Sequence, residues 1–409
     1  MREAEIGRRR PRSVRECALA HSFDRKVGKK MERIHVKVPG EQPQDREYMK
    51  QALALAEKGH GWVNPNPMVG AVLVKDGRII GEGYHTRYGQ LHAEREAFKN
   101  AAERGEETAG ADLYVTLEPC CHTGKQPPCT EAVLASGVKR VIVGCTDPNP
   151  VVAGRGIRLL REKGLEVVAG VLRGECERQN EVFFHFMRTK LPFTVLKYAM
   201  TLDGKTATVS GKSQWITGEA ARKRVHEDRG RYMAILTGVS TVLADNPQLT
   251  CRIPGGKNPI RVIADTKLRT PLSSTVVQTA RETPTWIVTA VSDAGRKKAY
   301  EDAGCRVLSV PAKEGELDLQ AMMQRLGEEK VDSVMVESGG TLAWSFLKAG
   351  LVNRVQAYIA PIFGGAGAPT PVRGTGVDAP PEAFLLKKPE AVWLGEDLLL
   401  EYEVSGQDA

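Results

Sequence analysis

The sequence predicts an α/β protein with two domains, and three observations support this fold class. The chain has 409 residues, which is too long for one core of ordinary size. Strand-like and helix-like apolar patterns alternate along most of the chain, as in layered α/β folds. The pattern is interrupted at 187–192, so we place a boundary near residue 190 and expect domains at 45–189 and 190–409.

The first domain is expected to begin with a helix at Asp45, a candidate N-cap. An apolar stripe at helical spacing runs from Tyr48 to Ala56, and the helix ends near Gly59. Asp76-Gly77 tolerates the positive φ of a tight turn and therefore predicts a hairpin. The elements expected after the first helix are strands at 68–74, 78–84, 113–117 and 138–144, helices near 93–104 and 129–136, and an α/β unit over 156–168.

The second domain also alternates between strands and helices. No Gly-x-Gly-x-x-Gly follows its first strand, so a dinucleotide-binding fold of the Rossmann type is not supported. The expected elements are strands near 193–201, 232–237, 259–264, 285–289, 333–337 and 354–359, and helices near 219–229, 317–328 and 341–349.

The net charge of +8 is concentrated near the N-terminus. Residues 1–45 hold twelve Lys/Arg against seven Asp/Glu, which gives +5 and leaves +3 for the other 364 residues. So small a charge disfavours a large nucleic-acid-binding surface. Residues 1–44 show no sustained hydrophobic period, and we interpret them as a disordered basic tail or as a start codon assigned too far upstream.

The sequence favours a cytoplasmic protein without a membrane partner. No apolar run approaches the roughly 18 residues that span a bilayer, and the N-terminus lacks the apolar stretch of a signal peptide. The eight cysteines are mostly scattered, which is unlike a disulfide framework. A local metal site in a reducing compartment explains Cys120, Cys121 and Cys129 better.

The strongest local signal is His92-Ala93-Glu94 followed by Pro119-Cys120 and Cys129. Zinc binds nitrogen and sulfur ligands tetrahedrally, and three protein ligands leave a fourth position for water. We therefore predict that His92, Cys120 and Cys129 bind zinc. Glu94 is the candidate general acid/base, since a hydrolytic site needs a group that moves protons.

Two details of this motif bear on its geometry. Residues two apart on a helix point about 200° away from each other, so helical periodicity does not explain how His92 and Glu94 meet. A position in the first turn of a helix would explain it.

Cys120 follows a strand and a proline, where the next helix is expected to begin, and amides at a helix N-terminus stabilise a thiolate.

A closed structural zinc site is the alternative, with Cys121 or His122 as a fourth ligand. Glu94 in the expected place disfavours it. The order His-x-Glu, then Pro-Cys and a second Cys, matches the signature of zinc-dependent nucleobase deaminases.

Several longer stretches resemble the riboflavin-biosynthesis deaminase-reductases, over roughly residues 45–400. The two cysteines of that family lie nine positions apart, as Cys120 and Cys129 do, whereas nucleic-acid deaminases typically have Cys-x-x-Cys. The resemblance implies a three-layer, cytidine-deaminase-like first domain. The stretches that resemble the family are Asn66 to Ala71, His92 to Glu94, Thr116 to Cys120, Pro127 to Cys129, Asp147 to Pro150 and Ala153 to Gly156.

The resemblance also implies a deaminase substrate pocket that includes Asn66, His85, His122 and Lys125. Taken alone, Asn66 before a proline is a turn residue, and Lys125 beside a glycine is a solvated loop residue. Cys121 departs from the family pattern, where a small polar residue is expected. It is either a competing thiolate or an inert small side chain, and we favour the second interpretation.

The second domain resembles the reductase half of the same family, which is similar to dihydrofolate reductase in fold. A predicted strand at 333–337 runs into Gly339-Gly340-Thr341 and then a helix, so phosphate could approach the free amides at the helix N-terminus. A tight strand-to-helix turn is the alternative. The stretches that carry the resemblance are Lys197 to Ala207, Ser213 to Thr217, Gly238 to Pro247 and Glu337 to Thr341.

The resemblance implies one set of residues for NADPH and another for the reductase substrate. Arginines suit the second set because a guanidinium grips phosphate with two hydrogen bonds. The NADPH set is Ala199, Trp215, Thr241, Asp245, Thr266, Gly339, Gly340, Thr341, Leu342, Ala343, Trp344 and Ser345. The substrate set is Ser213, Arg229, Leu249, Arg252 and Glu337.

The implied function is riboflavin biosynthesis. A zinc-dependent hydrolysis would deaminate 2,5-diamino-6-ribosylamino-4(3H)-pyrimidinone 5′-phosphate, and NADPH would then reduce the ribosyl group to a ribityl chain. We expect a homo-oligomer formed through the reductase domain. The alternative is a nucleoside or RNA base deaminase joined to an unrelated α/β domain, which the cysteine spacing and the low charge of the body disfavour.

Overall fold

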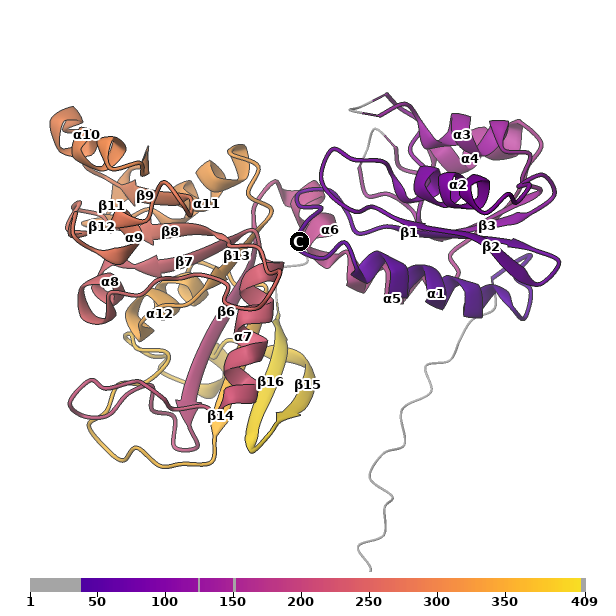
Figure 1. Cartoon of the computed structure of the whole chain (residues 1–409). Coiled ribbons are helices and arrows are strands. Elements are labelled where there is room, and N and C mark those ends of the chain that lie inside the picture. Colours follow the sequence, from indigo (N-terminus) through magenta and orange to yellow (C-terminus); the bar gives the residue numbers. More distant parts are fainter. Residues whose placement is uncertain (1–37, 124–125, 150–151, 406–409) are drawn as a thin grey trace, which may run out of the picture. The chain divides into compact units, whose positions relative to one another are not determined.

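The computed structural model describes residues 38–123, 126–149 and 152–405. Most of the predicted tail and Lys125 therefore lie outside the described residues. The described part contains two large sheets, one in each half of the sequence (Figure 1). Its helices include none long and apolar enough to cross a membrane.

The first sheet has five strands in the order β2-β1-β3-β4-β5. β1 pairs antiparallel with β2 and β3, whereas β3, β4 and β5 are parallel. The hairpin predicted at Asp76-Gly77 is present, with positive φ at both residues. The strands are β1 (Gly70–Lys75), β2 (Arg78–Tyr84), β3 (Asp112–Leu117), β4 (Arg140–Cys145) and β5 (Glu166–Ala169).

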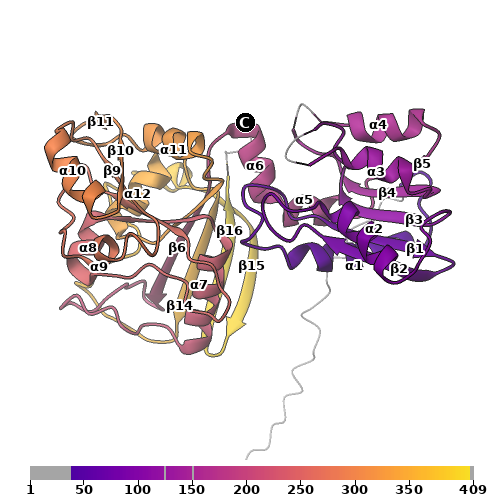
Figure 2. The same ribbon diagram turned by 45° about the horizontal axis from the view of Figure 1, so that its top comes forward.

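Helices cover both faces of this sheet and make three layers (Figure 1 and Figure 2). β3 shows how the two cores form, since Leu113 and Val115 pack in one and Tyr114 packs in the other. One face is covered by α2 (Ala93–Glu103), α3 (Cys129–Ala135) and α4 (Arg155–Glu162), and the other by α1 (Asp45–Glu57) and α5 (Arg173–Gln179).

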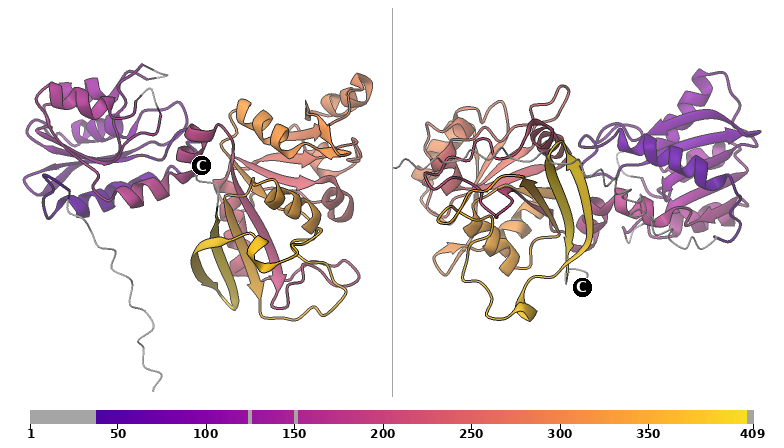
Figure 3. Two further views of the ribbon diagram at one scale, coloured as in Figure 1. Left: turned by 180° about the vertical axis from the view of Figure 1, so that it is seen from behind. Right: turned by 90° about the horizontal axis from the view of Figure 1, so that it is seen from below.

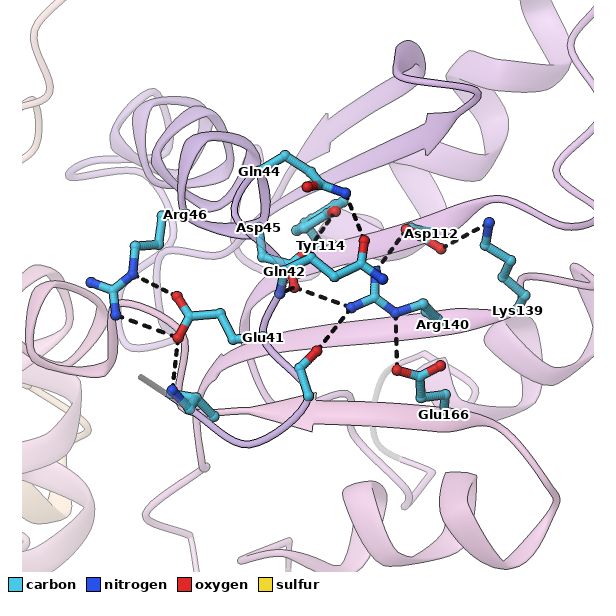
Figure 4. Close-up of polar contacts among 12 residues, drawn as sticks. Glu41, Gln42, Gln44, Asp45, Arg46, Asp112, Tyr114, Lys139, Arg140 and Glu166 are labelled. Atoms are coloured by element: carbon cyan, nitrogen blue, oxygen red, sulfur yellow. Dashed lines mark hydrogen bonds and ion pairs between the residues drawn. The ribbon is translucent and has the colours of Figure 1, made fainter. Parts of the chain in front are cut away.

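Two predictions at the start of this half are wrong. Asp45 is not the N-cap of α1; that residue is Gln44, and Asp45 is the first helical residue. Its carboxylate is fully buried, and a hydrogen bond from Tyr114 and an ion pair with Arg140 compensate for the loss of water (Figure 4). The described end of the predicted tail, 38–44, is also bound to the sheet, since the Gly40 carbonyl accepts a hydrogen bond from Arg140.

The predicted break at 187–192 is shorter than expected. A second helix, α6 (Glu181–Thr189), follows α5, so only residues 190–192 separate it from the first strand of the second sheet. α6 ends where Lys190 adopts a left-handed backbone, with φ of 60°. The cluster of aromatic residues from Phe183 to Phe186 explains the helix, because Phe184 and Phe186 are buried.

The second sheet has nine strands in the order β10-β9-β8-β7-β13-β6-β14-β16-β15. The strands from β10 to β14 in this order are parallel, and β16 and β15 continue the sheet as an antiparallel hairpin (Figure 3, yellow). The strands are β6 (Phe193–Thr201), β7 (Ala234–Gly238), β8 (Ile260–Ala264), β9 (Thr285–Thr289), β10 (Arg306–Ser309), β13 (Ser333–Val336), β14 (Arg354–Ala360), β15 (Leu386–Leu394) and β16 (Asp397–Val404).

Helices cover both faces of the second sheet as well. On β7, Ala234 and Leu236 pack in the core beneath α11 and α12, whereas Ile235 packs against α8 and α9 on the opposite face. The helices are α7 (Glu219–Arg231), α8 (Val239–Asp245), α9 (Thr275–Gln278), α10 (Ala294–Asp302), α11 (Leu319–Glu328) and α12 (Gly340–Lys348). The short strands β11 (Ala312–Lys313) and β12 (Glu316–Leu317) and a 3₁₀ turn (Pro380–Glu382) complete this half.

The order of these strands creates a switch point. The chain passes from β6 to β7, extends the sheet to β10, and returns to insert β13 between β7 and β6. Ligands of open α/β sheets bind at the carboxyl ends of the strands, where the strand order reverses. The segments that follow β7, β13 and β6 therefore meet where a ligand site is expected.

Candidate active sites

The predicted metal ligands come together from three elements. His92 precedes α2, Cys120 follows β3, and Cys129 is the first residue of α3. The His92 Nδ1 atom lies 3.6 Å from the Cys120 Sγ atom and 3.3 Å from the Cys129 Sγ atom. Among the described residues, these three form a group whose ligand atoms all lie within 4.8 Å of one another. One imidazole and two thiols fit zinc with an open fourth position.

Glu94 lies beside this group because, as predicted, the motif stands at the first turn of a helix. His92 is the N-cap of α2 and has an extended backbone, so the 200° rule for residues two apart on a helix does not apply to it. Glu94 is in the first turn and is 3% exposed. Burial raises the pKa of Glu94, and the nearby Cys120 raises it further. A carboxyl group with a raised pKa is suited to accept and return a proton.

The helix expected just after Cys120 begins only at Cys129, so that expectation is wrong in position. The expected contact between Cys120 and an amide at a helix N-terminus is nevertheless present, because the backbone N–H of Cys129, at the start of α3, donates to Cys120 Sγ at 3.3 Å. The pKa of the Cys120 thiol is lowered to about 4, chiefly by a hydrogen bond from the Cys129 thiol and also by His92. A thiolate is the form of cysteine that binds a metal.

A cavity opens beside these residues and contains the predicted pocket residues that the structure describes. Asn66 and His85 are in contact, with 3.2 Å between Asn66 Nδ2 and His85 Nε2. His85 Nδ1 lies 2.9 Å from the carbonyl oxygen of Leu91, and burial lowers the pKa of His85, which favours a neutral ring. The lining residues include Asn66, His85, His92, Glu94, Cys120, His122, Asp147 and Asn149.

In the second half, Arg229 and Glu337 form the centre of a charged cluster. Arg229 Nε lies 2.8 Å from one Glu337 oxygen, and Arg229 Nη2 lies 2.9 Å from the other. Lys197 Nζ lies 3.6 Å from Glu337. Burial alone would raise the pKa of Glu337, but Arg229 and Lys197 outweigh it and lower the pKa to about 2.

Lys197 was missed as a site residue in the sequence analysis. It is the charged residue within β6, whose preceding residues are apolar or small and buried, and its side chain is 13% exposed. Its Nζ atom also lies 5.6 Å from the centroid of the Tyr358 ring. A lysine in the middle of a buried strand was the available signal, because such a charge needs a partner.

The other predicted substrate residues are only partly brought together. Leu249 is buried with a φ of 53°, and the next residue, Thr250, accepts a hydrogen bond from Arg229 at 3.1 Å. Arg252 is largely exposed nearby, and partial desolvation together with the charge of Arg229 lowers its pKa. Ser213 lies in the segment between β6 and α7.

The predicted NADPH residues gather mainly at the carboxyl edge of the parallel strands. Ala199 is near the end of β6, Thr241 is in the helix after β7, and Thr266 follows β8. Gly339 is the exposed N-cap of α12, and a Cβ added there would meet no atom within 4 Å. The open helix N-terminus fits a phosphate of NADPH, because its first amides have no partners within the helix.

Two other residues of the NADPH set, Ala343 and Trp344, direct their side chains against other residues of the protein. The Ala343 side chain is 1% exposed and packs in the core, so the contact predicted between Ala343 and NADPH would have to be made by its backbone. The Trp344 ring packs edge-on against Phe384, with 5.6 Å between centroids. Trp215, in contrast, is 63% exposed and lies 4.8 Å from the Arg222 guanidinium.

The remaining residues of this set lie in two helices. Asp245 ends α8, where burial raises its pKa. Gly340 packs against the Thr370 carbonyl, which leaves no room for a side chain. Thr341, Leu342 and Ser345 continue the first turns of α12, and the Ser345 hydroxyl donates to the Thr341 carbonyl at 3.0 Å.

Comparisons with known proteins match both halves. Residues 42–145 match the model for the cytidine and deoxycytidylate deaminase zinc-binding region, and residues 192–400 match the RibD C-terminal domain. The riboflavin biosynthesis protein RibD of Actinobacillus pleuropneumoniae is 49% identical over 361 residues, covering 88% of this chain and 95% of the relative. The RibD protein of Escherichia coli (strain K12) is 41% identical over 370 residues, covering 87% and 98%.

Solved structures agree with these matches. The structure of Acinetobacter baumannii RibD has a TM-score of 0.79 at 36% identity and covers 89% of this chain and 99% of its own. A Thermotoga maritima diaminohydroxyphosphoribosylaminopyrimidine deaminase/5-amino-6-(5-phosphoribosylamino)uracil reductase has a TM-score of 0.78 at 39% identity and covers 88% and 99%. The predicted fold class is thereby confirmed. The chain belongs to the RibD family of riboflavin biosynthesis, bifunctional enzymes that join a zinc-dependent deaminase to an NADPH-dependent reductase.

Proposed function

We propose that His92, Cys120 and Cys129 hold the zinc of the deaminase and that Glu94 is its general acid/base. The convergence of these three ligand atoms within 4.8 Å, beside a buried carboxyl, is the observation that supports this proposal. Bound zinc supplies Lewis acidity that makes water a nucleophile near neutral pH. The substrate proposed for this site is 2,5-diamino-6-ribosylamino-4(3H)-pyrimidinone 5′-phosphate.

Side chains of the protein transfer the protons and bind the substrate. Glu94 accepts a proton from the attacking water and delivers it to the amine nitrogen, which leaves as ammonia. Asn66 is held by the neutral His85 ring and is placed to hydrogen-bond the pyrimidine. We assign the substrate phosphate to His122 and Lys125; His122 lines the same cavity, and Lys125 rests on the family resemblance.

For the reductase we propose that the carboxyl edge of the second sheet binds NADPH, with its phosphates at Gly339 and the first turn of α12. NADPH supplies the hydride that reduces the ribosyl group. Arg229 holds Glu337 in place, and Lys197 is the member of this cluster that can donate a proton to the opened sugar. Ser213, Leu249 and Arg252 are assigned to the substrate.

A coupled assay on purified protein tests both halves. Ammonia release and NADPH oxidation are followed separately with the diaminopyrimidinone substrate, beside a Glu94→Gln control. Ammonia that appears only with Glu94 intact, followed by NADPH consumption, supports both assignments. No ammonia from the zinc-loaded wild type would contradict the deaminase assignment, and ammonia without NADPH oxidation would contradict the reductase assignment.

We also propose a homo-oligomer formed through the second half. β15 is an edge strand whose residues are nearly all exposed, and Trp393 on it is 71% exposed. Exposed edge strands are usually covered by another chain or protected by charge. Sedimentation at several protein concentrations, with Trp393→Glu beside the wild type, tests this. A wild-type monomer at all concentrations would contradict it.

The proposed location is the cytoplasm, and the proposed partners are small molecules without nucleic acid or membrane. The scattered cysteines and the small charge outside the N-terminal residues support this. Cell fractionation with activity assays on each fraction tests the location, and an electrophoretic shift assay with RNA tests the partner. Activity in the membrane fraction or a shifted RNA band would contradict the proposal.

A further inference from the structure

Glu118 is a buried carboxylate next to the metal-ligand turn that the reaction scheme above does not use. It lies between the end of β3 and Pro119-Cys120, and it is 3% exposed. Its backbone N–H donates to the Cys145 carbonyl at 2.9 Å, which extends the pairing of β3 with β4. The backbone of Glu118 is therefore fixed by the sheet, and its side chain projects from a rigid base.

The carboxylate accepts hydrogen bonds from three backbone amides on a distant segment. One oxygen accepts from the N–H of Asp147 at 3.2 Å and from that of Gly154 at 2.8 Å. The other oxygen accepts from the N–H of Ile157 at 3.1 Å. Charge-assisted hydrogen bonds of this kind are stronger than neutral ones, so one side chain anchors both ends of the segment.

That segment contributes to the deaminase cavity. Asp147 and Asn149 line it together with Glu94 and Cys120. The Asp147 carboxylate in turn accepts a hydrogen bond from the Asn149 N–H at 2.8 Å, which ties the backbone of Asn149 to Asp147. Burial raises the pKa of Asp147 to about 6.

The other end of the segment is packed just as closely. A Cβ added at Gly156 would lie 2.2 Å from the Pro119 carbonyl and 3.2 Å from a Glu118 oxygen. Real Cβ atoms do not approach backbone oxygens so closely, and the first turn of α4 therefore lies directly on the Glu118-Pro119 peptide. This packing contact links the metal-ligand turn to the start of α4, in addition to the hydrogen bonds that Glu118 accepts from Asp147, Gly154 and Ile157.

We infer that Glu118 is a positioning residue for deamination, which holds Asp147 and Asn149 beside the zinc site and thereby sets the affinity for the pyrimidine. This inference rests on the deaminase function proposed above. A glutamine at 118 keeps the size of the side chain but turns an NH₂ group toward amide donors. It therefore loses at least one acceptor and the charge, and the segment loses an anchor.

The test measures ammonia release by the full-length, zinc-loaded protein, comparing wild type, Glu118→Gln and the control Asp45→Asn. Asp45 is another buried carboxylate of the same half, whose contacts are with Arg140, Tyr114 and Gln42. We expect Glu118→Gln to raise KM about tenfold with a smaller change in kcat and with zinc retained. Asp45→Asn should lower the unfolding midpoint and leave KM unchanged.

Wild-type KM and kcat in Glu118→Gln would overturn the inference, and so would loss of its zinc, because Glu118 would then support the ligand turn alone. If Glu118→Gln does not fold, Gly156→Ala takes its place, since it displaces α4 while keeping the carboxylate; an unchanged KM there would overturn the inference. Failure of the deaminase assignment is recognised separately, because the wild type itself would then release no ammonia.

Discussion

Arg229 donates two hydrogen bonds to the Glu337 carboxylate, from Nε at 2.8 Å and from Nη2 at 2.9 Å. This ion pair joins α7 to the end of β13. Both side chains are largely buried, at 12% and 13% exposure. The planar guanidinium matches a carboxylate in this geometry, which a lysine ammonium cannot reproduce. The pair sits at the switch point of the second sheet, where the reductase substrate is proposed to bind.

Replacing Arg229 with lysine should impair reduction and spare deamination. The charge remains, but one of two charge-assisted hydrogen bonds is lost, at a cost of about 1.5–3 kcal/mol, or roughly 10- to 100-fold in kcat/KM. The measurement follows NADPH oxidation and ammonia release in the same preparation. Arg325→Lys, at the exposed ion pair of Arg325 with Glu328 on α11, is the control. Equal reductase kinetics in the two variants would contradict the assignment.

The pKa of Glu337 predicts a pH-dependent contribution to stability. Its folded pKa, about 2, is below the ordinary value of 4.5, so the contribution is present above pH 4.5 and is lost as the pH falls toward 2. We expect the difference in free energy of unfolding between wild type and Glu337→Gln to be largest near neutral pH and to shrink below pH 4.5. Denaturant titrations at several pH values measure it. A difference that does not change with pH would exclude this linkage.

Arg140 should dominate the stability of the first half. Its guanidinium pairs with Asp45 at 3.1 Å, with Asp112 at 3.0 Å and with Glu166 at 3.1 Å, and it is 5% exposed (Figure 4). Arg140→Met leaves the fully buried carboxylate of Asp45 without a cation and should cost about 3–5 kcal/mol of unfolding free energy.

Lys139→Met is the matched control for this prediction. Lys139 also faces Asp112, at 3.7 Å, but its side chain is 63% exposed, so its loss should cost no more than about 1 kcal/mol. Urea unfolding followed by circular dichroism distinguishes the two. A loss in Arg140→Met as small as that in Lys139→Met would show that the buried network is dispensable.

The sequence predicted those elements of the fold that have regular apolar patterns. The buried strands β3 and β4 and the hairpin at Asp76-Gly77 were placed correctly, since their side chains are apolar or their turn chemistry is specific. α10 was missed because Tyr300 is the buried residue of an otherwise exposed helix. β15 was missed because it is exposed, and its Lys387-Lys388-Pro389 stretch resembles a loop.

Residues of the candidate sites were predictable where they lie in short motifs. His92, Glu94, Cys120 and Cys129 follow one another within 38 positions, and their chemistry is readable from the spacing. Contacts between residues that are far apart in the sequence could not be predicted. Lys197 meets Glu337 only because β13 is inserted beside β6, and this strand order cannot be inferred from local patterns.

Removing zinc should abolish ammonia release and leave the reductase intact. The buried residues of the cores on the faces of the second sheet all come from 193 onward, and the earlier residues packed against them, Val182 and Leu191, are not metal ligands, so its fold does not depend on the metal site. After chelation, the enzyme should still oxidise NADPH when it is given the deaminated pyrimidine. Adding zinc back should restore ammonia release, whereas release at the wild-type rate from the chelated enzyme would contradict a metal role.

Two cysteine variants locate that zinc. Cys129→Ser should lose the metal, because its sulfur lies 3.3 Å from His92 Nδ1 within the three-ligand group. Cys121→Ser should retain it, since Cys121 is outside that group despite its place beside Cys120. Metal analysis of each purified variant decides the matter, and loss of zinc from Cys121→Ser would identify it as a fourth ligand and favour a closed structural site.

Gly339→Ala should weaken NADPH binding without weakening the fold. The backbone of Gly339 has φ of −67°, which alanine adopts, and a Cβ there meets no atom of the chain within 4 Å. The added methyl therefore occupies only the space proposed for a phosphate, and we expect the Kd for NADPH to rise about tenfold. Calorimetric titration measures this independently of activity.

Gly174→Ala is the matched control for Gly339→Ala, because its Cβ also meets no atom within 4 Å, but it lies in α5 of the first half. Gly174→Ala should unfold at or slightly above the wild-type midpoint, since alanine stabilises the fold by about 0.4–1 kcal/mol through the lower conformational entropy of the unfolded chain. Gly339→Ala should unfold close to the wild-type midpoint, because alanine is a poorer N-cap than glycine and offsets this gain. If Gly339→Ala binds NADPH as Gly174→Ala does, the phosphates do not lie at the N-terminus of α12. The cofactor would then have to be held elsewhere along the carboxyl edge, and the glycines at 339 and 340 would serve only the turn from β13 into α12.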